Sequence, residues 1–94
     1  MQLTISDNNR ITNILLSFGV KRAGMFGSQA RRETHSGSDL DLLIELNDSA
    51  SLFDVIRIKH TLEDALHIGV DLIEYDAIKP ILRAQLLSDE IRLI

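Results

Sequence analysis

Residues 39–75 read DLDLLIELNDSASLFDVIRIKHTLEDALHIGVDLIEY and contain two short apolar segments on either side of a longer one with helical spacing. The first segment, 39–46, alternates as a strand does. One of its faces carries Leu40, Leu42 and Ile44, and the other carries Asp39, Asp41, Leu43 and Glu45. A capping-box pattern at Ser51 and Asp54 predicts a helix that runs to about residue 67. Gly69 is expected to end this helix, and residues 70–75 to form a second strand. A strand, helix and strand of these lengths predict a right-handed βαβ unit with parallel strands.

The segments on either side extend this pattern. Residues 6–9 are typical of a helix start, and the following apolar spacing predicts a helix that stops at Gly19. Residues 20–26 predict a strand, which should be antiparallel to 39–46 because the link is too short for a crossover. A last helix is expected from Asp76, with its stripe made by Ile78, Ile81, Leu82, Gln85 and Leu86. A closing strand is expected at 91–94. The predicted fold class is a small α/β (α+β) domain over residues 1–94, with a mixed sheet and helices packed on one face.

The predicted helix 52–67 has an apolar stripe of its own, made by Leu52, Val55, Ile56, Leu62 and Leu66. Among the acids, Glu45 is expected to be a surface residue at a strand end. The pair Asp89–Glu90 is expected to be solvated.

Composition narrows the classes of function. The formal net charge of −4 argues against a nucleic-acid duplex as the main ligand, because duplex binding depends on Lys and Arg. A nucleotide remains compatible, since a bound divalent metal reverses the local sign of a carboxylate site. Without cysteine, the chain has neither disulfides nor thiolate metal sites. The polar N-terminus and short apolar runs predict neither a signal segment nor a membrane span, and a cytoplasmic location is the expectation.

Three acids are the candidate catalytic residues. Asp39 and Asp41 point to the same face of a strand, where two carboxylates repel each other unless a cation joins them. Hard oxygen ligands favour Mg²⁺ or Mn²⁺. Asp71 lies in an otherwise apolar strand, so it is expected to need a partner. If 70–75 lies beside 39–46, as the βαβ unit predicts, Asp71 can share a sheet face with Asp39 and Asp41. The alternatives are two solvated acids at a strand edge and, for Asp71, a salt bridge to Arg31 or Arg32.

Gly27 and Ser28 follow the strand predicted at 20–26. Gly27 allows the backbone to approach a phosphate, and a helical turn after Ser28 would stabilise an anion with its amide groups. An ordinary strand-to-helix turn is the alternative. The P-loop pattern Gly-x-x-x-x-Gly-Lys and the hydrolase elbow Gly-x-Ser-x-Gly are both absent from this part of the sequence.

Residues 27–33, GSQARRE, and 38–42, SDLDL, together resemble the signature of the polymerase beta-like nucleotidyltransferase superfamily, and most closely its minimal, single-domain branch. That signature is Gly-Ser-x-Ala-Arg-Gly followed, after a spacer, by Ser-Asp-x-Asp and a hydrophobic residue. The chain departs from it at Arg32, where the family often has Gly. The segment around Asp71 also falls in place.

The resemblance implies a two-metal nucleotidyl transfer with ATP as substrate. Asp39 and Asp41 would hold two Mg²⁺ ions, with Mn²⁺ as a substitute, and Asp71 would bind the ion that activates the attacking hydroxyl. Gly27 and Ser28 would hold the β- and γ-phosphates, with Ser38 also on the nucleotide side. Arg31 would neutralise charge on the leaving pyrophosphate.

The acceptor is also implied by the resemblance alone. Minimal nucleotidyltransferases are commonly paired with a HEPN-type protein encoded nearby, act as its type VII antitoxin, and attach AMP to its tyrosine hydroxyl. The apolar C-terminal segment 81–94 offers a surface for such a complex, or it packs in the core. Two other functions stay open: an antitoxin that neutralises its partner by contact alone, and the nucleotide-binding subunit of a two-component transferase acting on small molecules.

Overall fold

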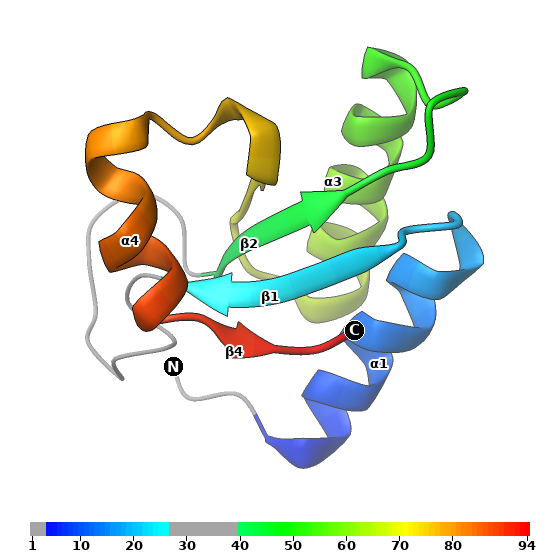
Figure 1. Cartoon of the computed structure of the whole chain (residues 1–94). Coiled ribbons are helices and arrows are strands. Elements are labelled where there is room, and N and C mark those ends of the chain that lie inside the picture. The colour runs from blue at the N-terminus through cyan, green and yellow to red at the C-terminus, as the bar shows by residue number, and fades with distance from the viewer. Residues whose placement is uncertain (1–3, 27–39) are drawn as a thin grey trace.

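The computed structural model of the chain describes residues 4–26 and 40–94. Its elements in order are α1 (Ile5–Ser17), β1 (Arg22–Phe26), β2 (Leu40–Glu45), α3 (Leu52–Leu66), β3 (Val70–Glu74), the 3₁₀ turn η1 (Tyr75–Ala77), α4 (Pro80–Ser88) and β4 (Ile91–Arg92). The strands form one sheet in the order β3-β2-β1-β4 (Figure 1). Strands β2 and β3 are parallel, whereas β1 is antiparallel to both β2 and β4. The predicted mixed sheet, the βαβ pairing and the α/β (α+β) class are confirmed. The helices are not all on one face, because α4 packs on the face opposite to α1 and α3.

The alternation of β2 divides the core between the two faces of the sheet. Helices α1 and α3 cover the first face, where the buried side chains are almost all aliphatic. This core contains Leu40, Leu42 and Ile44 of β2 together with Ile11, Leu15, Ile58, Leu62 and Leu66 of the helices. A smaller cluster covers the second face and consists of Phe26, Leu43, Tyr75 and Ile78, with Ile73, Leu86 and Leu87 packed against it. The second face is therefore covered by η1 and α4.

Helix α1 begins earlier than the sequence pattern indicates. Its N-cap is Thr4, whose hydroxyl accepts a hydrogen bond from the Asp7 amide while the Asp7 carboxylate accepts one from the Thr4 amide, both at 3.0 Å. This reciprocal capping box lowers the pKa of Asp7, because the ionised carboxylate is the better acceptor. The cluster 6–9 thus lies inside the first turns. At the other end Gly19 has a φ of 77°, as its predicted role as helix stop requires.

The junction between α3 and β3 differs by two residues from the prediction. The residue with left-handed backbone is His67, with a φ of 57°, and Gly69 lies in the link beyond it. The Glu63 carboxylate then accepts a hydrogen bond of 3.0 Å from the amide of Val70. The last turn of α3 therefore holds the first residue of β3, which is the residue before Asp71.

Two predicted apolar stripes are partly wrong. On α3 the buried residues are Ile58, Leu62 and Leu66, whereas Leu52 is 73% exposed and Ile56 is 41% exposed. The first turn of α3 is thus largely exposed, and the buried residues of this helix begin at Ile58. On the C-terminal segment Ile81 and Leu82 are also exposed.

The C-terminal part has a break that the sequence pattern did not predict. Asp76 belongs to η1, and α4 starts at Pro80, which occupies the first helical position with Lys79 as N-cap. Proline is favoured there because the first amide of a helix has no intrahelical partner. The expected closing strand is present as β4, although it is only two residues long. Over the described residues, none of the helices has the length and apolar character that a bilayer span requires.

Candidate active site

Asp41 and Asp71 are direct neighbours across the parallel pair β2–β3, because their Cα atoms are partners in the register. Partners in a parallel ladder project on the same face, and adjacent strands are about 4.8 Å apart. Both residues lie on the second face, since Leu43 and Ile73, two positions further along each strand, belong to its cluster. The sequence prediction that Asp71 shares a face with Asp41 is confirmed.

Strand β1 brings a third side chain to this row. Phe26 is the antiparallel partner of Asp41, so the row across the sheet reads Phe26, Asp41, Asp71. The chain leaves β1 at Phe26 immediately before Gly27, and it enters β2 at Leu40 immediately after Asp39. The row therefore lies where both halves of the motif meet the sheet.

The remaining predicted site residues, Gly27, Ser28, Arg31, Ser38 and Asp39, lie outside the described residues, as does Arg32. Within residues 4–26 and 40–94, no three His, Asp or Glu side chains gather closely enough to hold a metal ion. The third carboxylate of the predicted set is Asp39. The described part of the site consequently supplies two carboxylates of the predicted three.

The surroundings of Asp71 differ from the expectation. Because the strand 70–75 is otherwise apolar, the sequence predicted a desolvated acid that needs a partner. Asp71 is in fact exposed and Asp41 is half-buried. The difference arises because β3 is an edge strand of the sheet, and the α4 cover packs against Ile73 rather than Asp71. Water can solvate the Asp71 carboxylate, so no desolvation penalty forces a partner on it.

The donor chemistry at this row fits a divalent metal. Two carboxylates on adjacent strands supply hard oxygen ligands, and Mg²⁺ in proteins is held by one or two carboxylates while it keeps several waters and substrate phosphates. The open side of an exposed Asp71 leaves room for those waters and phosphates. Asp41 and Asp71 are the described residues that would hold such an ion.

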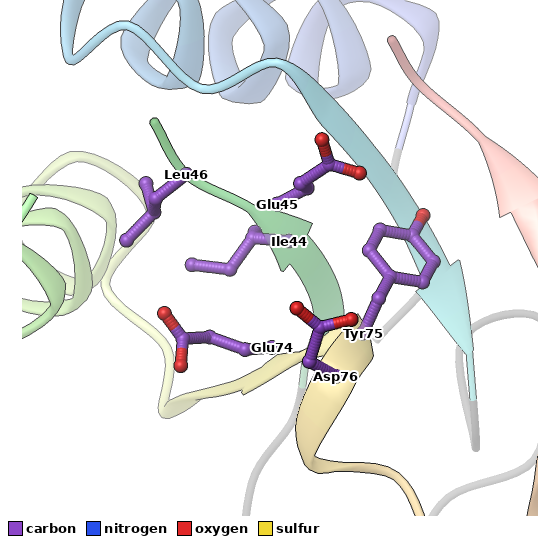
Figure 2. Close-up of a pocket in the computed structure, with 6 residues that line it drawn as sticks. All are labelled: Ile44, Glu45, Leu46, Glu74, Tyr75 and Asp76. Carbon is purple, nitrogen blue, oxygen red and sulfur yellow. The ribbon is translucent and has the colours of Figure 1, made fainter. Parts of the chain in front are cut away.

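A hollow of about 80 Å³ lies at the other end of the strands. Its lining residues are Ile44, Glu45, Leu46, Glu74, Tyr75 and Asp76. Figure 2 shows Ile44 and Glu74 on one side of β2 and Tyr75 on the other, so the hollow wraps around the strand ends. A hollow of this size is far below the roughly 300 Å³ of small ligand sites, and three carboxylates in its wall would repel a triphosphate. This hollow is not a nucleotide site.

Sequence reasoning missed a buried polar cluster on the second face. The Tyr75 hydroxyl donates a hydrogen bond to the Glu90 carboxylate, and the Arg22 guanidinium lies 3.6 Å from that carboxylate and 4.2 Å from the centre of the Tyr75 ring. The Glu90 side chain is only 5% exposed, so the expectation of a solvated Asp89–Glu90 pair is wrong for Glu90. Burial, followed by the hydrogen bond and charge of Glu90, raises the pKa of Tyr75 to about 12. Arg22 and Glu90 lie at opposite ends of the chain, so no local pattern could pair them.

A mixed sheet with two helices on one face and paired aspartates on the other agrees with the nucleotidyltransferase fold that the sequence resemblance implies. The family model for polymerase beta nucleotidyltransferases matches residues 9–94. The chain belongs to this family, and it is a nucleotidyltransferase.

Individual relatives agree with this assignment. A candidate protein adenylyltransferase of Methanocaldococcus jannaschii is 43% identical over 87% of this chain and 88% of its own. The protein adenylyltransferase MntA of Thermococcus cleftensis is 37% identical over 66% of this chain and 63% of its own. The solved structure of a candidate minimal nucleotidyltransferase superposes with a TM-score of 0.80 at 34% identity, covering 92% of this chain and 88% of that one. An antitoxin in complex with an AMPylated HEPN toxin of Shewanella oneidensis, at 20% identity and a TM-score of 0.73, shares the fold over 95% of this chain and 70% of its own.

Proposed function

We propose that the chain transfers AMP from ATP to a hydroxyl group of a HEPN-type partner protein and so acts as its antitoxin. The observation that carries the proposal is the lateral pairing of Asp41 and Asp71 at the end of the sheet where β1 and β2 meet the motif residues 27–39. The protein adenylyltransferases among the relatives support the reaction class, and the toxin–antitoxin complexes of the same fold support the kind of partner.

The reaction exchanges one phosphoester bond for another. The acceptor oxygen attacks the α-phosphorus of ATP, the bond from that phosphorus to the bridging oxygen of the β-phosphate breaks, and pyrophosphate leaves. The hydroxyl proton passes to Asp71 or directly to solvent. Because Asp71 is exposed, a proton that it accepts can be released to solvent. Bound Mg²⁺ ions would supply charge stabilisation at the attacking and leaving oxygens.

The other residues of the proposed site bind and orient the nucleotide. Asp39 and Asp41 would hold the metal ions, and Gly27 and Ser28 would hold the β- and γ-phosphates through backbone amides and a hydroxyl. Arg31 would neutralise pyrophosphate, and Ser38 would lie on the nucleotide side. The half-buried Asp41 is the better-fixed of the two described carboxylates, because β1 and β3 flank it on both sides. We assign it the role of primary metal ligand.

The experiment uses the purified chain with α-³²P-labelled ATP, Mg²⁺ and the HEPN-type protein encoded beside it. Label should move to a tyrosine of the partner and abolish the partner's toxic activity. Asp41→Asn should remove the label. The matched control is Glu45→Gln, because Glu45 lies on the same strand and face as Asp41 but at the end away from Asp71. This variant should transfer label to the partner at the wild-type rate.

The competing functions give different results. Inhibition of the partner by the Asp41→Asn chain, with no label transferred, would identify an antitoxin that works by contact. Label on an added small molecule and none on the partner would identify the subunit of a two-component transferase. Replacing Mg²⁺ by Mn²⁺ should preserve labelling, whereas a chelator should stop it.

A further inference from the structure

We infer that Glu90 is a positioning residue for nucleotide binding: with Tyr75 and Arg22 it fixes α4 over the second face, beside the strand end that leads into residues 27–28. The inference rests on the proposed function, since it assigns a residue that tunes the same site. Glu90, Tyr75 and Arg22 lie on the second face, where side chains form rows across the strands.

The rows follow from the strand registers. The first contains Phe26, Asp41 and Asp71, and the second contains Gly24, Leu43 and Ile73. The third begins with Arg22 and Glu45 and is completed by Tyr75, which directly follows β3. Along the second face, the side chains are thus acidic at the candidate site, apolar in the middle row and polar again in the cluster of Arg22, Tyr75 and Glu90.

Glu90 fills a space that only glycine leaves in the middle row. A Cβ placed on Gly24 would collide with the Glu90 side chain. The carboxylate therefore lies directly against the backbone of β1, where Tyr75 and Arg22 both reach it. A carboxylate that is 5% exposed is strongly disfavoured unless it is paired and hydrogen-bonded, so it stays in this place only while both partners hold it.

This arrangement connects the polar cluster to the candidate site through α4. Glu90 lies two residues after the end of α4, and Leu86 and Leu87 of α4 pack on the cluster that contains Phe26. Figure 1 shows the C-terminal end of α4 beside the end of β1. Holding Glu90 thus holds the C-terminal turn of α4 against the strand from which the chain enters the phosphate-binding turn proposed at 27–28. Arg83 adds a second tie, because its guanidinium donates a hydrogen bond of 3.0 Å to the Tyr75 carbonyl.

The test measures nucleotide affinity apart from turnover. The full chain is titrated by calorimetry with α,β-methylene-ATP and Mg²⁺, because the transfer reaction cannot cleave this analogue. Glu90→Ala should weaken binding about tenfold, equivalent to the loss of a buried charged hydrogen bond. In labelling assays the KM for ATP should rise by a similar factor, while kcat at saturating ATP stays within about twofold. Glu90→Gln keeps an oxygen acceptor for Tyr75 and should bind within about threefold of wild type.

A double variant separates positioning from simple loss of a contact. Gly24→Ala should weaken binding as Glu90→Ala does, because the new Cβ expels the carboxylate. The pair Gly24→Ala with Glu90→Ala should bind no worse than Glu90→Ala alone, since the clash needs both side chains. Asp89→Ala, which removes a charge one residue away, is the matched control and should bind as wild type does.

Each outcome has a defined meaning. Variants that melt at lower temperature but bind the analogue with unchanged affinity overturn the inference, because Glu90 then contributes to stability alone. Additive losses in the double variant also overturn it. If Glu90→Ala does not fold, Tyr75→Phe carries the test, with weaker binding expected although its melting temperature falls by only about 4 to 8 °C. A wild-type chain that binds no nucleotide overturns the proposed function and this inference together, whereas a wild type that binds, with unaffected variants, overturns only the inference.

Discussion

On the face covered by α1 and α3, β2 contributes Leu40, Leu42 and Ile44, whereas on the opposite face it contributes Asp41, Leu43 and Glu45. The first face is a closed aliphatic core with two helices above it. The second is covered only in part, by η1 and α4, and keeps polar groups at both ends. One strand therefore supplies stability on one side and chemistry on the other, and the two roles should separate under substitution.

The largest effect is expected at Asp41 on the second face. Asp41→Asn should lower the rate of AMP transfer by about a thousandfold or more, because a metal ligand and its charge are lost. The free energy of unfolding without metal should change by less than about 1 kcal/mol, since Asp41 is half-buried and its loss relieves repulsion with Asp71. Labelling kinetics and urea unfolding measure the two quantities. A large loss of stability in Asp41→Asn would show that the second face contributes to stability as well as to activity.

The converse is expected on the first face. Ile58 is fully buried between α3 and the sheet, so Ile58→Ala should cost about 3 kcal/mol of unfolding free energy. Its kcat at a temperature where the chain stays folded should match wild type. The matched control is Leu52→Ala on the same helix, where 73% exposure predicts a change within about 0.5 kcal/mol. Equal costs at the two positions would mean that the start of α3 is covered in solution.

The partial cover of the second face predicts a smaller packing effect. Leu86 is a half-buried residue of α4 that packs against the second face of the sheet. Leu86→Ala should therefore lower the unfolding free energy by about 1 to 1.5 kcal/mol, roughly half the value for Ile58. A cost that matches Ile58→Ala would show that α4 is as much a part of the core as α3.

The smallest stability effect at neutral pH is expected in the polar cluster of Arg22, Tyr75 and Glu90, where it should depend on pH. The pKa of Tyr75 is raised to about 12 from its ordinary value of 10.0, so the folded state holds the hydroxyl proton more tightly than the unfolded state. Its stabilisation is complete below pH 10 and is lost as pH rises towards 12. Tyr75→Phe should cost about 1 kcal/mol at neutral pH, and the difference should shrink and then reverse across this window. Urea unfolding of both chains over this range measures the effect, and Tyr75 is the chain's single tyrosine, so its ionisation can be followed directly. Parallel pH curves would show that the hydroxyl is neither buried nor hydrogen-bonded to Glu90 in solution.

The sequence predicted those parts of the fold that depend on local periodicity. The alternation in 39–46 assigned Leu40 and Asp41 to opposite faces, and the length of the βαβ unit required β2 and β3 to be parallel. These two features predicted that Asp71 can share a sheet face with Asp41, and the register of β2 and β3 then made the two residues direct partners. The spaced motif around Gly27 and Asp39 was sufficient to indicate the family, although the roles of Gly27, Ser28, Arg31, Ser38 and Asp39 stay predictions.

Where prediction was wrong, the cause lay in neighbours that are distant in sequence. Periodicity shows which side of a helix is apolar, but it does not show where the layer beneath that helix ends, so Leu52 and Ile56 were expected to be buried. Asp71 was expected to be desolvated because its strand is apolar, yet β3 is the sheet edge. The position of Pro80 marked a helix start, and the 3₁₀ turn before it separated Asp76 from α4.

By itself, the sequence determined the strands, their alternation, the parallel pairing and the family, because each depends on spacing along a short stretch of chain. Only the tertiary structure decided the solvent exposure of Asp71 and which turns of α3 are covered. It also decided that the Glu90 side chain is buried against Gly24, between Tyr75 and Arg22. Burial and charge pairing depend on which surfaces meet after folding, and residues at opposite ends of this chain meet on the second face of the sheet.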